Sequence, residues 1–181
     1  MKINLQDLIL NIKDIKVGQK ILLSGDIYTA RDSAHKRVID ILNKGEDLPI
    51  DLKNSAIYYC GPTPVKPGEI VGSCGPTTSS RMDVYTTRIL KEGVKVLIGK
   101  GARSEYVVKS FKKNNAIYLV ATGGVGALIS KRVKKSELLV FEDLGPEAIY
   151  RFEVKDMPLI VAIDSFGNSI FNKICPTFIN T

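Results

Sequence analysis

The sequence predicts a single α/β domain, residues 1–181, in which a mixed β-sheet is flanked by helices. Helix-like and strand-like segments alternate through the middle of the chain, and strand-like segments dominate both ends, which is typical of this class. With 181 residues, 44% of them hydrophobic and 25% charged, the chain is long enough to bury a sizeable core. No internal repeat or composition break divides it.

The individual elements follow from apolar periodicity and turn residues. Residues 32–43 are expected to form a helix because apolar side chains recur there at a spacing near 3.6, and Gly45 should end it. Residues 55–60, SAIYYC, have the composition of a buried strand. Residues 61–78, GPTPVKPGEIVGSCGPTT, form a Pro- and Gly-rich loop, and long loops inside compact domains are often functional.

The same criteria place the remaining elements. Strands are expected at residues 3–5, 20–24, 94–98, 116–121, 138–141, 150–154, 158–163 and 169–171, and helices at 79–92, 105–113 and, after the glycine-rich residues 122–126, in a short segment that ends at Lys131.

Several classes of protein are excluded or disfavoured. No apolar run approaches the roughly 20 residues of a membrane span, and polar residues interrupt the N-terminal segment too often for a signal peptide, so a cytoplasmic protein is expected. Cys60, Cys74 and Cys175 form no CxxC motif, and His35 is the one histidine. This argues against a disulfide framework and against a zinc or iron–sulfur site made by this chain alone.

The net charge of +7 is compatible with nucleic acid, a small anion or an acidic protein partner. Nucleic acid is disfavoured because the lysines are dispersed and no basic motif is interleaved with aromatic residues. The densest basic run, residues 131–135, is interpreted as a solvated helix end, where the helix dipole favours cations.

The segment GSCGPTTSSRMD, residues 72–83, carries unusually dense turn chemistry before a helix. Thr77 or Thr78 is expected to cap that helix. Arg81 would lie in its first turn, where the dipole disfavours a cation unless an anion also binds. Two interpretations stay open: a capped helix with a solvated arginine, or an anion site.

Two other junctions repeat this arrangement. In GDIYTARDSAHKR, residues 25–37, Arg31 stands at a helix entry that Thr29 or Asp32 could cap, and His35 on the same helix face is interpreted as structural rather than as a base. In the triplet GKG, Lys100 follows a strand and is either an anion ligand or an exposed turn residue.

Two further motifs are interpreted as structural. ATGGVGALISK, residues 121–131, lacks the dinucleotide pattern and suits close helix–strand packing. In FEDLGPEAI, Pro146 and Glu147 suit a helix start, and Glu142 and Asp143 are assigned a structural role.

Taken together, Arg31, Arg81 and Lys100 stand at strand-to-helix junctions, which lie along one edge of an open α/β sheet. Three cations with nearby hydroxyl donors suit a small polyanion such as a dicarboxylate.

These motifs, together with YYCGPTP and VAIDSFGN, occur in an order that resembles the β subunit, or C-terminal domain, of class I fumarate hydratases and the related tartrate dehydratases. The resemblance covers roughly residues 20–170. It implies a swivelling β/β/α fold and a hydro-lyase that reversibly hydrates a C4 dicarboxylate, fumarate to L-malate in the commonest case. It also implies a 4Fe–4S cluster held by three cysteines of a separate α subunit, in a complex expected to contain two α and two β chains.

The resemblance assigns roles to matching positions. It implies that Arg31, Arg81 and Lys100 bind substrate carboxylates, that Thr78 donates a hydrogen bond nearby, and that Thr77 is the candidate base for the C3 proton. A threonine hydroxyl is a poor base at its ordinary pKa, so cationic surroundings must stabilise its alkoxide, or a second group must relay the proton. Asp32 and His35 are expected to orient Arg31.

Three rival functions remain at this point. The chain could serve a tartrate dehydratase or a hydratase for a methylated fumarate, which the motifs separate poorly. It could be a stand-alone anion-binding regulatory module. The third, a nucleic-acid-binding protein, rests on charge alone and requires steeply salt-dependent binding.

Overall fold

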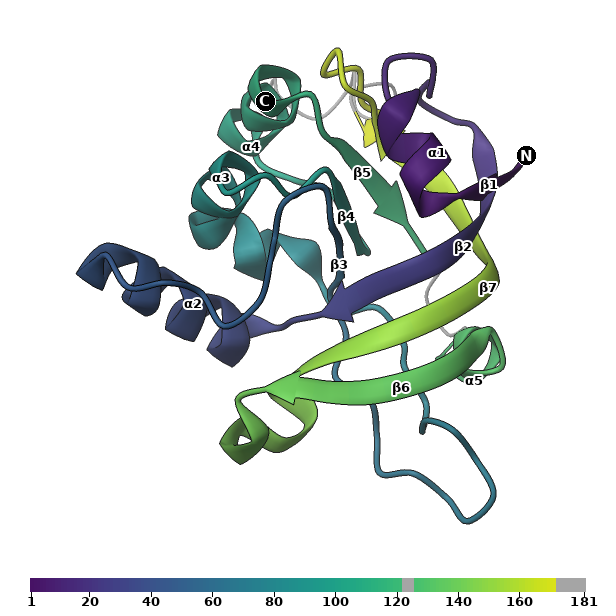
Figure 1. Ribbon diagram of the computed structural model, residues 1–181. Coiled ribbons are helices and arrows are strands. Elements are labelled where there is room, and N and C mark those ends of the chain that lie inside the picture. Colours follow the sequence, from purple (N-terminus) through teal and green to yellow (C-terminus); the bar gives the residue numbers. More distant parts are fainter. Residues whose placement is uncertain (122–125, 172–181) are drawn as a thin grey trace, which may run out of the picture.

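The computed structural model describes residues 1–121 and 126–171. Within these ranges the elements, in chain order, are β1 (Lys2–Asn4), α1 (Leu5–Leu10), β2 (Lys20–Thr29), α2 (Asp32–Lys44), β3 (Ala56–Tyr58), the 3₁₀ helix η1 (Ser79–Met82), α3 (Asp83–Lys91), β4 (Val96–Gly99), α4 (Glu105–Asn114), β5 (Ile117–Val120), α5 (Gly126–Ser130), β6 (Val133–Val140), the 3₁₀ helix η2 (Glu142–Glu147) and β7 (Ile149–Ile163) (Figure 1).

The sheet is mixed and partly closed. Strands β1 to β5 pair in parallel in chain order, and β7 pairs antiparallel with β5, β6 and β2. Because β7 contacts both β5 and β2, the strands β2, β3, β4, β5 and β7 complete a cycle of pairings. An α/β domain with a mixed sheet and flanking helices is therefore confirmed.

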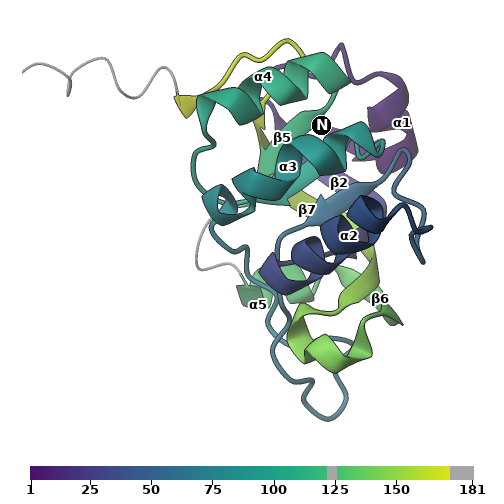
Figure 2. The ribbon, with the colours of Figure 1, turned by 90° about the vertical axis from the view of Figure 1, so that its left-hand side faces the viewer.

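The chain forms three layers. Helices α2, α3 and α4 lie together on one side of the parallel strands β3, β4 and β5, as Figure 2 shows, and β2, β7 and β6 form the layer beyond those strands. Side chains of β3, β4 and β5 alternate between two buried clusters, one inside the strand cycle and one beneath the helices. Tyr58 belongs to the first, whereas Ile57 and Tyr59 belong to the second. A strand that is covered on both faces has apolar residues at consecutive positions, which explains the sequence SAIYYC around β3.

Several expected elements differ from the observed ones. The N-terminal strand ends at Asn4, whose side chain caps the unexpected helix α1 by accepting from the Gln6 amide. Residues 150–154 and 158–163 belong to one strand, β7, rather than two. The interpretation of residues 131–135 as a helix end was wrong, because β6 begins at Val133 and this basic run lies mainly on an edge strand, where lysines oppose further pairing.

Other differences are smaller. Residues 169–171 form no strand and make a single bridge, between Ser169 and Ile163. Pro146 and Glu147 close η2 rather than start a helix. The expected turn at residues 122–125 and Cys175 lie outside the described residues. In the described part of the chain, no helix is long and apolar enough to cross a membrane.

Candidate functional site

The backbone frame of the site is built at the carboxyl ends of three neighbouring parallel strands, β2, β3 and β4. The Ala30 amide donates to the Tyr58 carbonyl (3.1 Å), which holds the start of α2 beside the end of β3. After the long loop the chain returns to the same place, because the Thr77 amide donates to the Tyr59 carbonyl (2.7 Å). The three junctions that carry Arg31, Arg81 and Lys100 are therefore adjacent, as expected for such a sheet edge.

Ser79, which sequence reasoning did not single out, ties the loop to the end of β4. Its amide donates to the Lys100 carbonyl (3.0 Å), and its hydroxyl oxygen accepts from the Lys100 amide (3.1 Å) and from the Tyr118 hydroxyl (2.8 Å). A parallel bridge joins Thr78 to Lys100 at the same point. The side chains of Thr78 and Lys100 themselves are exposed, and they make no hydrogen bond or ion pair with the described part of the chain.

The two arginines meet around one carboxylate. Asp32 Oδ2 lies 3.7 Å from Arg31 Nη2 and 3.3 Å from Arg81 Nη2. Arg81 Nη2 also donates to Thr77 Oγ1 at 2.8 Å. Arg31, Asp32, Arg81 and Thr77 thus form one chain of contacts, although they come from two separate strand ends.

The contact between Arg81 and Thr77 has a chemical consequence. A guanidinium that donates to a hydroxyl oxygen stabilises negative charge on that oxygen more than it stabilises the neutral hydroxyl. It also leaves the hydroxyl proton available for another acceptor. Thr77 therefore has one feature that a threonine requires to exchange a proton with a substrate carbon.

Glu147 is a site residue that sequence reasoning assigned to a helix start. Its Oε1 lies 3.3 Å from Arg31 Nη2, and its Oε2 accepts from the Ser33 amide at 2.9 Å. Burial by itself raises the pKa of Glu147, but the hydrogen bonds from Ser33 and the charges of Arg31 and Arg81 lower it on balance. The sequence signal was an acid after Gly145 and Pro146, whose partner on α2 could not be read from the chain.

These contacts replace the expected helix caps. Neither Thr29 nor Asp32 caps α2: Arg31 occupies the cap position without a side-chain bond, and Glu147 binds an amide of the first turn instead. Thr78 occupies the cap position of η1, yet its hydroxyl makes no capping bond. The helix entries are held by tertiary contacts, so the threonine hydroxyls are not used up by capping.

The charge balance of the cluster is slightly positive. Arg31 and Arg81 pair with the carboxylates of Asp32 and Glu147, and Lys100 at the end of β4 is a third cation, which leaves one net positive charge at this edge. Arg31 Nε is buried and has no hydrogen-bond partner among the described residues. A buried donor without an acceptor is costly.

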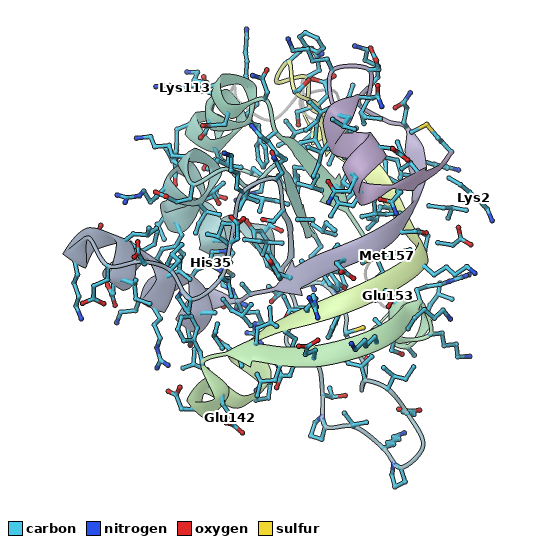
Figure 3. All side chains as sticks on the ribbon, viewed as in Figure 1. Lys2, His35, Lys113, Glu142, Glu153 and Met157 are labelled. Atoms are coloured by element: carbon cyan, nitrogen blue, oxygen red, sulfur yellow. The ribbon has the colours of Figure 1, made fainter. Side chains whose placement is uncertain are left out.

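His35 supports the backbone of Arg31 from below. Its Nδ1 lies 2.8 Å from the Arg31 carbonyl oxygen. Its ring stacks on the ring of Tyr85 and packs edge to face with the ring of Tyr59. Figure 3 shows His35 reaching from α2 toward the parallel strands. The pKa of His35 is lowered to about 4, chiefly by burial and also by the nearby charge of Arg103, which together outweigh the raising effects of the Arg31 carbonyl and Asp32. A neutral buried imidazole is poorly suited to act as a base on a substrate.

We expect the stability of the protein to fall as the pH drops from about 6.5 to about 4. In the unfolded chain His35 binds a proton near pH 6.5, whereas in the folded chain it does so only near pH 4. Between these values the unfolded state binds more protons than the folded state, so the free energy of unfolding falls as the pH is lowered through this window. The loss should approach about 3 kcal/mol. Urea denaturation of the wild type and of His35→Gln at several pH values measures it. An equally steep fall in the variant would show that other groups cause it.

A second expected result concerns Gly61, which packs against Arg31. A Cβ at Gly61 would lie 3.1 Å from Arg31 Cδ and 2.9 Å from the Pro146 carbonyl oxygen. Gly61→Ala should therefore displace Arg31 and lower the free energy of unfolding by about 1–3 kcal/mol. The control is Gly75→Ala, because the nearest atom to a Cβ there is Gly126 Cα at 3.6 Å. Equal stability of the two variants in urea denaturation would contradict the expectation.

A buried ion pair lies behind the site. Arg103 Nε donates to Asp83 Oδ1 (2.6 Å), and the Ser104 amide donates to Asp83 Oδ2 (2.9 Å). The Arg103 side chain is fully buried, and it also donates to the Thr86 hydroxyl. This pair joins the first turn of α3 to the loop that carries Lys100, so it holds two parts of the site in register.

The described residues do not fit an iron–sulfur cluster. No group of three or more potential metal ligands occurs among them. Cys60 and Cys74 are both buried free thiols, and burial raises the pKa of Cys60 well above its ordinary value and that of Cys74 to about 12. A cluster needs thiolates, and these two sites disfavour them.

Comparison with known proteins confirms the resemblance. The family model described as "Fumarase C-terminus" matches residues 1–174. The chain is 42% identical over 170 residues to "Putative L(+)-tartrate dehydratase subunit beta" of Methanocaldococcus jannaschii, an alignment that covers 91% of this chain and 87% of that protein.

Two further relatives are much longer than this chain. It is 38% identical over 159 residues to "Fumarate hydratase 2" of Leishmania major, and 34% identical over 172 residues to "Fumarate hydratase class I, aerobic" of Escherichia coli. These alignments cover 87% and 94% of this chain, but only 28% and 31% of the relatives. The chain belongs to the fumarase C-terminus family.

Proposed function

We propose that this chain is the β subunit of a 4Fe–4S-dependent hydro-lyase that reversibly hydrates fumarate to L-malate. The observation that carries the proposal is the contact chain in which Arg81 bonds Thr77 and shares Asp32 with Arg31. It joins two cations suited to carboxylates with one hydroxyl suited to proton exchange. The family membership supports the same chemistry.

In the proposed reaction, Arg31, Arg81 and Lys100 bind the two substrate carboxylates and Thr78 donates a further hydrogen bond. Thr77 exchanges the proton at C3. During hydration its hydroxyl gives this proton to C3, the hydroxyl group of a water molecule adds to the neighbouring carbon, and the remaining proton of that water restores the Thr77 hydroxyl. During dehydration the same transfers run in reverse and water is released. Arg81 stabilises the Thr77 oxygen when it carries negative charge. Asp32 and Glu147 orient the two guanidinium groups.

The rest of the enzyme would come from a partner. We propose that a separate α subunit holds the cluster, which would supply a Lewis acid for the substrate hydroxyl, and that two α and two β chains assemble. The net charge of +7 suits both an anionic substrate and an acidic partner surface. The three layers described above agree with the swivelling β/β/α assignment, which belongs to this proposal.

The proposal is tested by anaerobic co-expression with the candidate α subunit, followed by reconstitution of the cluster. Fumarate absorbance is followed after addition of L-malate, with tartrate in parallel. Activity that requires both chains supports the half-enzyme assignment. A complex with an intact cluster but no activity on either acid would contradict the substrate class, and failure to form any complex would favour a stand-alone anion-binding module.

The role of Thr77 has its own test in the assembled enzyme. Thr77→Val keeps the shape of the side chain but removes the oxygen, so kcat should fall by about 10²-fold or more while KM changes little. Thr78→Val is the matched control, and it should act mainly on KM. A change confined to KM in Thr77→Val would reduce Thr77 to a binding residue.

A tartrate dehydratase is the second candidate, because the relative named for that activity aligns over 87% of its own length. A hydratase for methylated fumarate is a third possibility within the same site chemistry. The parallel assay with each acid decides among them, since the carboxylate-binding residues do not report the substituent on the other carbon.

A further inference from the structure

Besides Arg31 Nε, three buried polar atoms near the site have no hydrogen-bond partner among the described residues: Tyr59 Oη, His35 Nε2 and Arg103 Nη1. All three side chains are buried, Tyr59 with 0% and His35 with 1% of its surface exposed. Buried polar groups are almost always hydrogen-bonded, to protein or to ordered water. Three such atoms in one small domain therefore call for an explanation.

The three side chains gather around one ring. The centroid of the His35 ring lies 5.3 Å from that of Tyr59, with the rings edge to face. Arg103 Cζ lies 5.5 Å from the same Tyr59 centroid. The unpartnered atoms thus belong to neighbours in the region between α2, the end of β3 and the loop before α4.

The three atoms differ in whether they donate or accept a hydrogen bond, and this difference restricts what can bind among them. Because the Arg31 carbonyl can only accept, His35 Nδ1 carries the proton, and Nε2 of the neutral ring is an acceptor. Arg103 Nη1 is a donor only, and the Tyr59 hydroxyl can donate or accept. An occupant that contacts all three atoms must therefore accept from Arg103 and donate to His35.

We propose that ordered water occupies a buried site among Arg103 Nη1, Tyr59 Oη and His35 Nε2. A water molecule can accept from Arg103, donate to His35 and bond Tyr59 at once, and buried waters typically make about three such bonds. An anion would face the lone pair of His35, and a cation would face the guanidinium of Arg103. Neither fits the donors and acceptors present.

The water completes a continuous hydrogen-bonded path across the domain. It would link the Arg31 carbonyl, through His35, to Arg103, and Arg103 is bonded in turn to Asp83. The path joins the β2–α2 junction to the β4–α4 junction. That it holds two substrate-binding regions in register rests on the proposed function, but the water site itself does not.

The test compares Tyr59→Phe with Tyr85→Phe in the full-length chain. If water bonds the Tyr59 hydroxyl, removing that hydroxyl loses a hydrogen bond and lowers the melting temperature by about 2–4 °C. Tyr85, half-buried and stacked on the same histidine, makes no hydrogen bond within the described residues through its hydroxyl, so Tyr85→Phe should change the melting temperature little. A Tyr59→Phe variant as stable as the wild type, or more stable, would overturn the proposal, because deleting an unpaired buried hydroxyl removes a cost.

A crystal structure of the full-length chain at high resolution provides the second measurement. Solvent density within hydrogen-bonding distance of all three atoms is the expected result. A direct bond between Tyr59 and His35, with no solvent density beside Arg103, would overturn it. Neither measurement uses enzyme activity, so failure of the water site and failure of the proposed function are distinguishable.

Discussion

Arg81→Ala should lower kcat/KM of the assembled enzyme by about 10²–10³-fold while leaving the fold and the assembly intact. The variant loses the bond to Thr77 and, under the proposed function, one cation for a substrate carboxylate, and charged groups that act at the reacting centre each contribute on this scale. Stability should change little, because the Arg81 side chain is 49% exposed and its ion pair with Asp32 lies at the surface.

Arg88→Ala is the matched control for this prediction. Arg88 belongs to the adjacent helix α3, is 42% exposed and pairs with Glu92, the C-cap residue of that helix, so it resembles Arg81 in exposure and pairing but not in position. It should retain wild-type kinetics. Steady-state rates, gel filtration of the complex and thermal melting separate the outcomes. Loss of assembly in Arg81→Ala would make Arg81 structural, and unchanged kinetics would remove it from the site.

The second large effect is on stability. Arg103→Met should lower the free energy of unfolding by about 3–5 kcal/mol, because it leaves the buried Asp83 carboxylate without its counter-charge. The cost is large because the Arg103 side chain is fully buried and that of Asp83 is 8% exposed. Removal of both charges should cost less, so Arg103→Met combined with Asp83→Leu should be more stable than Arg103→Met alone.

The control for the buried pair is the bidentate pair Arg37–Asp143 at the surface. Its two contacts are short, 2.7 and 2.8 Å, but Asp143 is 65% exposed, so Arg37→Met should change the free energy of unfolding little. Urea denaturation at neutral pH measures both. An Arg103→Met variant no less stable than Arg37→Met would show that the buried pair contributes nothing beyond a surface contact.

Much of the fold was predictable from local pattern. The helix at α2, its end at Gly45 and the buried strand β3 follow from apolar spacing and turn residues, and each was found at or near its expected position. The failures had local causes too. Helix α1 is only six residues long, too short for a periodic signal, and the basic residues 131–135 concealed the start of an edge strand.

The sequence by itself determined which chemical groups stand at the strand-to-helix junctions. Arg31 and Lys100 directly follow β2 and β4, so a parallel arrangement of these strands places both along one edge. Thr77 and Arg81 come after a long loop, and the hydrogen bond from the Thr77 amide to the Tyr59 carbonyl returns them to that edge. Only the tertiary structure decided what each group contacts. Asp32 lies between two arginines because η1 lies against α2, and Glu147 reaches the first turn of α2 because β7 and η2 return beside β2. Periodicity reports which face of an element is buried, but it carries no information about which distant side chain completes a hydrogen bond.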